Sequence, residues 1–221
     1  MSGSAPSTPV LIASYPRSGN TMLRTVLYHC FGLPSGSVYP DDLGGNKRLE
    51  RYVGHIEHQS GGQLAFPKGA IPLVKTHHPP AGAANPAIYV MRDGRAATAS
   101  LWQFYSGNMP LQQIIKGKTP WGTWSDHLSQ WRPWQRPQTL LIRYEDLTGN
   151  LAGVVDGLAA FLRREPVATA IPKRESIAEV DGRWVKPPSR WQDILPMDML
   201  ELFYRYNRPM MEKMGYLEGG E

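Results

Sequence analysis

Residues 15–21 have the composition of an anion-binding loop. They read Tyr-Pro-Arg-Ser-Gly-Asn-Thr and lie between a short apolar run, residues 10–14, and a stretch with helical spacing. A strand that turns directly into a helix presents backbone N–H groups at the positive end of the helix dipole. Gly19 lets the backbone approach an anion closely, and Arg17 adds a fixed positive charge. Further side-chain donors come from Ser18, Asn20 and Thr21. The loop therefore predicts a phosphate site, although an N-capped turn without a ligand has similar residues.

Two familiar nucleotide-binding patterns are absent from this turn. ATP-binding loops read Gly-x-x-x-x-Gly-Lys-Ser/Thr, and dinucleotide-binding turns read Gly-x-Gly-x-x-Gly. Neither pattern occurs between residues 10 and 31. A small P-loop kinase is therefore the less favoured interpretation, because it would also need a Walker lysine and an acidic strand end for magnesium.

Arg92 and Ser100 form a second candidate phosphate contact. They follow an apolar run at residues 87–91 and are eight positions apart. Eight residues make a little over two helical turns, so both side chains lie on roughly one side of a helix. Arginine can offer a two-pronged hydrogen bond to a phosphate. The alternatives are an ion pair between Arg92 and Asp93 and a solvated Ser100.

Two adjacent histidines end another apolar run, in the sequence Val-Lys-Thr-His-His-Pro at residues 74–79. A histidine at a strand end can act as a general base near neutral pH, although a structural histidine is the ordinary alternative. His77 and His78 would point to opposite faces of a strand, and no cysteine or acidic residue is spaced to complete a metal site. We therefore predict no metal here, and both a general base and a structural histidine stay open at this point.

These segments together resemble the motifs of sulfotransferases that use 3′-phosphoadenosine-5′-phosphosulfate (PAPS). Residues 15–21 resemble the family's 5′-phosphosulfate loop, commonly Tyr-Pro-Lys-Ser-Gly-Thr-Thr, with Arg17 in place of the lysine and Asn20 in place of a threonine. Arg92 and Ser100 match the arginine and serine that hold the 3′-phosphate in this family. The resemblance implies that both ends of the nucleotide have a binding motif here.

The histidine segment resembles the family's Lys-Thr-His-Leu-Pro stretch. His77 aligns with its catalytic base and Lys75 with a supporting cation, whereas His78 takes the leucine position and is the competing candidate for the base. The resemblance implies an in-line displacement in which the base removes the acceptor proton. Arg17 and Lys75 would then stabilise the charge that develops during transfer.

Weaker matches follow later in the chain. Tyr144 lies in a segment whose tyrosine is near the adenine in this family, and Ser176 falls where the family often has a nucleotide-contacting serine. The C-terminal motif Arg-Lys-Gly-x-x-Gly-x-Trp-Lys is largely missing, with residues 190–192 as its remnant. Arg183 and Lys186 are predicted to supply charge to the 3′-phosphate instead.

The resemblance implies a donor but no particular acceptor. The implied cofactor is PAPS with its product PAP, 3′,5′-adenosine bisphosphate, and the acceptor group is a hydroxyl or an amine of a small molecule, a glycan or a lipid. A non-catalytic module that binds PAP or PAPS is the main alternative. An open acceptor site in a short chain could also be completed by a second subunit, so a homodimer is left open.

Apolar runs and helical spacings alternate along the chain. Predicted strands cover residues 10–14, 71–76, 87–91 and 139–143. Predicted helices cover residues 21–31, 93–105, 121–135, 151–164 and 198–214, with a shorter helix near 47–58. This alternation predicts an α/β fold with a central parallel sheet and helices on both faces, as in the P-loop-like fold of sulfotransferases.

The bulk composition fits one globular domain. The chain has 221 residues, 41% hydrophobic and 19% charged, which suits a single α/β domain over residues 1–221 with a flexible leader at 1–9. Its net charge of +5 is not gathered into one basic block, so we predict no nucleic acid partner. Residues 1–9 lack the features of a secretory signal, and no apolar run approaches the roughly 18 residues of a membrane span. We therefore expect a cytoplasmic location.

Overall fold

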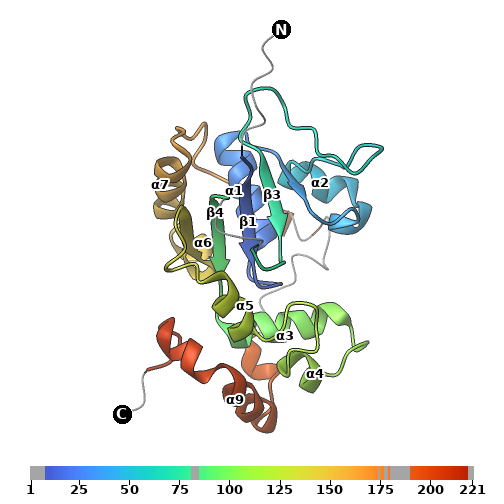
Figure 1. Cartoon of the computed structure of the whole chain (residues 1–221), viewed down its shortest axis with the longest axis vertical. Coiled ribbons are helices and arrows are strands. Elements are labelled where there is room, and N and C mark those ends of the chain that lie inside the picture. The colour runs from blue at the N-terminus through green and yellow to red at the C-terminus, as the bar shows by residue number, and fades with distance from the viewer. Residues whose placement is uncertain (1–7, 81–84, 174, 177–178, 180–189, 219–221) are drawn as a thin grey trace.

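A computed structural model describes residues 8–80, 85–173, 175–176, 179 and 190–218 (Figure 1). Two residues predicted to contact the nucleotide, Arg183 and Lys186, lie outside the described residues. Within the described part, no helix is long and apolar enough to cross a membrane.

A five-stranded parallel sheet forms the centre of the chain. Its strands are β1 (Val10–Ser14), β2 (Ser35–Ser37), β3 (Leu73–Thr76), β4 (Ala87–Met91) and β5 (Thr139–Arg143), in the order β2-β3-β1-β4-β5. Strands β2 and β3 therefore lie on one side of β1, and the later strands β4 and β5 lie on the other. In open α/β sheets, ligands bind beyond the carboxyl ends of the strands at such a reversal.

Helices connect and cover the strands. They are α1 (Asn20–Phe31), α2 (Lys47–Val53), α3 (Gly94–Tyr105), α4 (Leu111–Ile115), α5 (Trp124–Trp131), α6 (Tyr144–Gly149), α7 (Leu151–Leu162) and α9 (Met197–Lys213). Short 3-10 helices lie at η1 (Asp42–Gly45) and η2 (Trp191–Asp193). The predicted α/β fold with a parallel sheet flanked by helices is confirmed.

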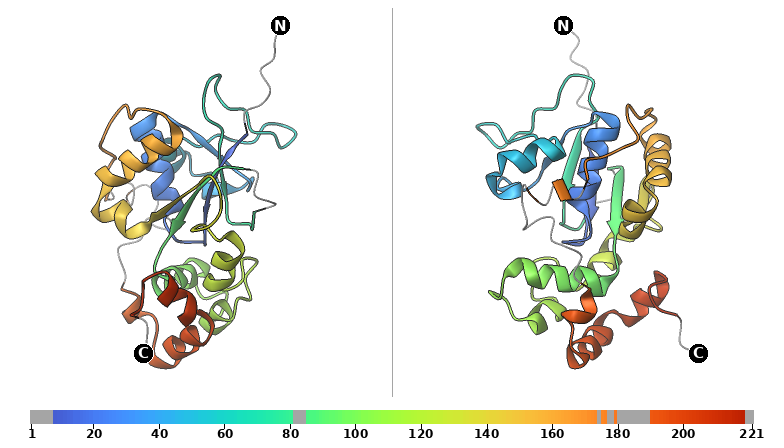
Figure 2. Two further views of the ribbon diagram at one scale, coloured as in Figure 1. Left: turned by 60° about the vertical axis from the view of Figure 1, so that its left-hand side comes forward. Right: turned by 180° about the vertical axis from the view of Figure 1, so that it is seen from behind.

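Side chains alternate between two cores on opposite faces of the sheet. Along β4, Ile88 and Val90 pack with residues of α1, α6 and α7, whereas Ala87, Tyr89 and Met91 pack with residues of α3, α4, α5 and α9. Figure 2 shows α9 in red beside the green helices α3 to α5, and α7 in orange beside the blue α1. A strand buried on both faces needs apolar residues at successive positions, which is why this run carries no polar alternation.

Several elements differ from the sequence prediction. The Ser-Gly-Ser strand β2 has no apolar side chain to signal it, and α4 and α6 are short helices that were not predicted. The helix predicted at residues 121–135 is limited to α5. Thr123 and Asp126 form a capping box at its start, and Arg132 ends it in a left-handed conformation.

Candidate active site

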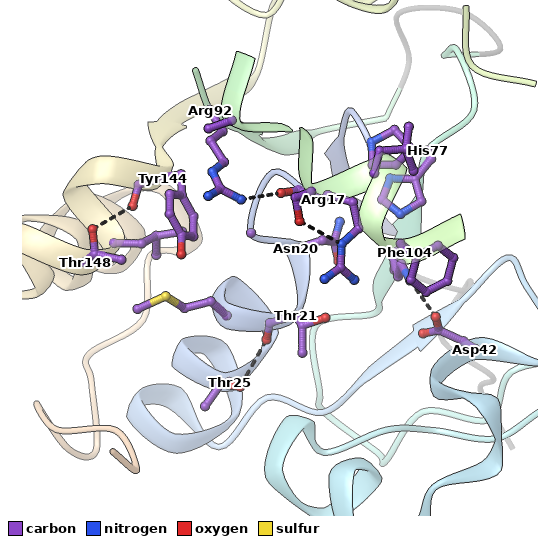
Figure 3. Close-up of a pocket in the computed structure, with 18 of the residues that line it drawn as sticks. Arg17, Asn20, Thr21, Thr25, Asp42, His77, Arg92, Phe104, Tyr144 and Thr148 are labelled. Carbon is purple, nitrogen blue, oxygen red and sulfur yellow. Dashed lines mark hydrogen bonds and ion pairs between the residues drawn. The ribbon is translucent and has the colours of Figure 1, made fainter. Parts of the chain in front are cut away.

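A large cavity lies at the carboxyl ends of β1, β3 and β4. Its volume is about 960 Å³, which is within the range of small-molecule and cofactor sites. Ala13 pairs with Thr76 and Ser14 with Val90, so the segments that leave these three strands begin side by side. The lining residues include Arg17, Gly19, Asn20, Thr21, Lys75, His77, Arg92, Ser100 and Tyr144 (Figure 3). The fold therefore brings together the three segments that the sequence singled out.

The loop between β1 and α1 has the backbone of an anion site. Arg17 and Gly19 have positive φ angles of 67° and 108°, and no side-chain hydrogen bond from the described residues caps the start of α1. Ser18 is buried, and its Oγ has no hydrogen-bond partner among the described residues. A buried hydroxyl without a partner costs free energy unless a ligand satisfies it. The loop geometry thus suits an anion with several acceptor oxygens.

Replacing Gly19 with alanine is expected to lower the affinity for PAP about tenfold and to cost about 1–3 kcal/mol in the free energy of unfolding. A Cβ there would lie 2.5 Å from Cδ2 of Tyr144, and φ at this residue is +108°. Calorimetric titration with PAP and thermal denaturation measure the two effects. Gly157→Ala is the matched control, because a Cβ at Gly157 in α7 meets nothing within 4 Å. Equal losses in both variants would contradict a special role for Gly19.

The side chain of Asn20 faces inward, which differs from its predicted role as a side-chain donor to the anion. Its Nδ2 donates to the carbonyl oxygen of Ile12 at 3.1 Å and to Oγ of Ser14 at 3.5 Å. The amide therefore ties the start of α1 to β1. Asn20 can serve an anion through its backbone N–H, as a residue in the first turn of α1.

Arg17, Arg92 and Ser100 lie together on another wall of the cavity. Arg17 Nε donates to Ser100 Oγ at 3.3 Å, and Arg92 donates to the carbonyl oxygen of Arg17 at 3.0 Å. The Arg92 guanidinium lies 4.4 Å from the centre of the Tyr144 ring. Figure 3 shows Arg92, Arg17 and Tyr144 around one open space. Ser100 is therefore hydrogen-bonded to Arg17 and not directly to Arg92, although all three line the same cavity.

The His77 ring is neutral and has a defined tautomer. Its Nδ1 lies 2.7 Å from the carbonyl oxygen of Ser14, so Nδ1 carries the proton and Nε2 carries the lone pair. Burial, together with the nearby Lys75 ammonium, holds the pKa of His77 well below its ordinary value of 6.5. The Tyr39 ring stacks on the His77 ring, with the ring centres 5.8 Å apart, and the Tyr39 hydroxyl accepts from the His77 backbone N–H at 2.9 Å. His78 is exposed and does not line the cavity.

A buried histidine that the sequence did not single out supports His77. His127 in α5 lies 2.9 Å from the carbonyl oxygen of His77 through Nε2 and 2.7 Å from the Tyr89 hydroxyl through Nδ1. Because a carbonyl only accepts, Nε2 carries the proton and Tyr89 donates to Nδ1. Burial lowers the pKa of His127 to about 4. This neutral histidine fixes the backbone of the strand end on which His77 lies.

The depressed pKa of His127 predicts acid sensitivity of the fold. Its ordinary value is 6.5 and its folded value is about 4, so the unfolded chain binds the proton first as the pH falls. Stability is therefore fully present above pH 6.5 and is lost between pH 6.5 and 4, by about 3 kcal/mol from this residue. Denaturant unfolding at several pH values, compared with His127→Gln, measures the effect. An identical pH dependence in both proteins would contradict it.

A buried ionic cluster adjoins the cavity and was also missed by the sequence analysis. The Asp42 carboxylate bonds to Lys75 Nζ through Oδ1 at 2.5 Å and to the Arg24 guanidinium through Oδ2 at 2.6 Å. Burial alone would raise the pKa of Asp42, but the two cations lower it to about 2. Arg24 could have indicated the cluster from sequence, because it is a charged residue among the apolar positions of a predicted helix. Lys75 and Asp42 both line the cavity.

Of the weaker sequence matches that the structure describes, Tyr144 lines the cavity and the others do not. Tyr144 lies at the start of α6, against Gly19 and Arg92, and lines the cavity. Ser176 is described but is not among the lining residues. Trp191, part of the degraded C-terminal motif, lies in η2, with its ring 4.5 Å from the Arg95 guanidinium.

Among known proteins, the chain is similar in sequence to sulfotransferases. Human Sulfotransferase 1E1 is 25% identical over 185 residues, covering 71% of this chain and 60% of that protein. Sulfotransferase 4A1 from Mus musculus is 27% identical over 176 residues, covering 69% and 59%. The chain thus spans about 60% of the length of these curated relatives.

Solved structures show the same fold at low sequence identity. Mouse sulfotransferase SULT7A1 complexed with PAP matches with a TM-score of 0.60 and 17% identity, covering 98% of this chain and 87% of that one. Retinol dehydratase in a complex with retinol and PAP matches with a TM-score of 0.64 and 18% identity, covering 94% and 82%. The model of the sulfotransferase domain matches residues 7–186, well over half of the sequence. The chain belongs to the sulfotransferase domain family.

Proposed function

We propose that this chain transfers a sulfuryl group from PAPS to an acceptor hydroxyl or amine, with His77 as the general base. The observation that carries the proposal is that His77 lines the same cavity as the β1–α1 loop, Arg92 and Ser100. Family membership and neighbours solved with PAP support it. Because the chain spans only part of its curated relatives, donor, acceptor and activity are all proposed for this chain.

The residues of the cavity fit a nucleotide with two phosphate-bearing positions. The start of α1 and Arg17 would hold the 5′-phosphosulfate through backbone donors and a positive charge. Ser18 belongs to the same loop and has a buried hydroxyl without a partner among the described residues, but it is not among the lining residues of the cavity. Arg92 and Ser100 would hold the 3′-phosphate, and Tyr144 would lie near the adenine. Ser176, Arg183 and Lys186 remain proposed nucleotide contacts. When bound, PAPS supplies the sulfuryl group and PAP is the leaving group.

His77 would accept the proton of the acceptor at Nε2. Its Nδ1–H is held by the carbonyl oxygen of Ser14, so Nε2 is the nitrogen left for the acceptor. The ring is neutral at pH 7 because burial and Lys75 lower its pKa. Arg17 and Lys75 would stabilise the negative charge that develops on the transferring and leaving groups. Preorganised charges of this kind act strongly in a site from which water is excluded.

The walls near His77 support an acceptor with an apolar or ring-bearing body. Tyr39, Phe104 and Trp121 line the cavity, and the Trp121 ring centre lies 6.0 Å from that of His77. Aromatic side chains contribute flat apolar surface to ligand sites. The acceptor hydroxyl or amine would then lie at the His77 end, whether the molecule is a small ring compound, a glycan or a lipid.

The proposal is tested by following PAP formation from PAPS by chromatography with a panel of phenols, sterols, aliphatic alcohols, amines, glycans and lipids. We expect acceptor-dependent PAP formation that requires His77. If PAP binds but none of the acceptors raises PAP formation above the His77→Ala background, a non-catalytic PAP-binding module becomes the better interpretation.

A further inference from the structure

Lys75 lines the cavity, but its ammonium group belongs to a buried ionic cluster. It is 4% exposed, and its Nζ bonds to Asp42 at 2.5 Å. Asp42 lies in η1, far from Lys75 in sequence, and its second carboxylate oxygen binds Arg24 of α1. One carboxylate thus bridges two buried cations that come from different elements.

The far side of the cluster is firmly anchored. Arg24 is fully buried, and it donates from Nε to Ser35 Oγ at 2.8 Å and from its NH2 group to the Ser35 carbonyl oxygen at 3.3 Å. The same guanidinium lies 2.9 Å from Nδ1 of His55. Arg24 therefore fixes the orientation of the Asp42 carboxylate, and the carboxylate in turn fixes Lys75. Figure 3 shows the Asp42 contact at the edge of the cavity that also holds His77 and Arg17.

Building on the proposed sulfuryl transfer, we propose that Asp42 is a positioning residue that holds the Lys75 ammonium charged at the transfer end of the cavity. Asp42 would act through Lys75 and not on the acceptor. A surface ion pair contributes little, but a buried carboxylate between two cations cannot be removed without leaving uncompensated charge. The geometry therefore links the charge of Lys75 to the Asp42 carboxylate.

The charged groups around Lys75 shift its pKa in opposite directions. Its pKa is lowered by burial and by the neighbouring arginines, and Asp42 is the group that raises it. The titratable and charged groups that face it are Asp42 from η1, Arg24 from α1, Arg17 from the β1–α1 loop, His55 after α2, Tyr39 before η1, and His77 after β3. Removing Asp42 leaves a lysine among cations, where the neutral amine is favoured.

The test compares pH–rate profiles of Asp42→Asn, Arg24→Met and the wild type, with PAPS saturating. For Asp42→Asn we expect kcat to fall about 10–100-fold, while the affinity for PAP changes less than about threefold. The alkaline limb of the pH–rate profile of Asp42→Asn should move about one unit or more to lower pH, because Lys75 loses its proton at lower pH than in the wild type. Arg24→Met removes the opposing cation, so its alkaline limb should move to higher pH. Asp156→Asn removes the same charge from an exposed carboxylate on α7, outside the cavity lining, and should leave the alkaline limb in place.

A double-mutant comparison separates positioning from a general structural role. In a Lys75→Met background, Asp42→Asn should cause little further loss of kcat, because the group it positions is gone. If Asp42→Asn alone does not fold, Arg24→Met/Asp42→Asn removes the stranded guanidinium. That variant should then show the loss of kcat and the shift to lower pH relative to Arg24→Met. Full additivity of Asp42→Asn and Lys75→Met, or an unchanged alkaline limb in Asp42→Asn, would overturn the inference.

The protonation of Lys75 can also be measured without turnover. Carbon-13 NMR of protein labelled at lysine Cε, with Lys75→Met for assignment, follows its titration directly. We expect Lys75 to titrate at lower pH in Asp42→Asn and at higher pH in Arg24→Met than in the wild type. The same titration in all three proteins overturns the inference about Asp42. A wild type that makes no PAP from PAPS with any acceptor counts against the proposed function alone.

Discussion

Replacing His77 with alanine is expected to lower kcat for sulfuryl transfer about 10²–10⁴-fold, the usual contribution of a positioned general base. The affinity for PAP should stay within about threefold of the wild type, because the proposed contacts of Arg92 and Ser100 with the 3′-phosphate do not involve His77. The physical reason is the tautomer of His77, in which Ser14 holds Nδ1–H and leaves Nε2 for the acceptor proton. Steady-state rates with PAPS and an accepted acceptor, together with calorimetric titration of PAP, measure both effects.

His78→Ala is the matched control for this experiment. His78 is the adjacent histidine, but its side chain is exposed and lies outside the cavity lining. Its backbone N–H bonds to Thr76 and its carbonyl oxygen to Trp131, and neither contact needs the imidazole. This variant should keep nearly wild-type kcat. A His77→Ala variant with wild-type activity would rule out His77 as the base, and a loss confined to His78→Ala would move the base to His78.

Replacing Arg92 with alanine is expected to raise the KM for PAPS about 10–100-fold, the cost of removing a hydrogen bond to a charged partner. The effect on kcat should be smaller, because Arg92 would hold the nucleotide and take no part in the transfer. Arg92→Lys keeps the charge but loses the planar two-pronged donor, so it should recover only part of the affinity. Initial rates at varied PAPS concentrations give these values.

Part of that loss will come from the surroundings of Arg92. Its guanidinium also stacks on Tyr144 and donates to the Arg17 carbonyl oxygen. Arg48→Ala removes the same charge from an exposed side chain on α2, and it should leave the KM unchanged. An unchanged KM in Arg92→Ala would remove this residue from the 3′-phosphate site. A loss of equal size in Arg48→Ala would instead reveal a general effect of net charge.

The candidate site could be predicted from sequence wherever its residues follow strands of the sheet. The loop at residues 15–21, His77 and Arg92 come directly after β1, β3 and β4, which are neighbours in the sheet. The carboxyl ends of neighbouring parallel strands meet at one edge of the sheet, so residues that follow these strands are expected to lie together, as they do in the cavity. The fold class could be predicted for the same reason, because the buried strands are continuous apolar runs.

The groups that support the site could not be predicted in this way. Asp42 reaches Lys75 from a 3-10 helix in a region rich in glycine, serine and aspartate, where no spacing indicates the contact. His127 reaches the strand end from α5, and only tertiary packing brings the two together. Asn20 belongs to the predicted loop, but its amide is taken by Ile12 and Ser14. Side-chain direction at these positions depends on neighbours that are distant in sequence.

Transfer of label from the donor tests the central proposal most directly. The protein is incubated in parallel with PAPS labelled with ³⁵S and with ATP labelled at the γ-phosphate with ³²P, each with the acceptor panel and with and without magnesium. We predict that ³⁵S moves to an acceptor without added magnesium, that ³²P does not move, and that His77→Ala abolishes the transfer. Magnesium-dependent transfer of ³²P with no transfer of ³⁵S would contradict the account and favour a kinase.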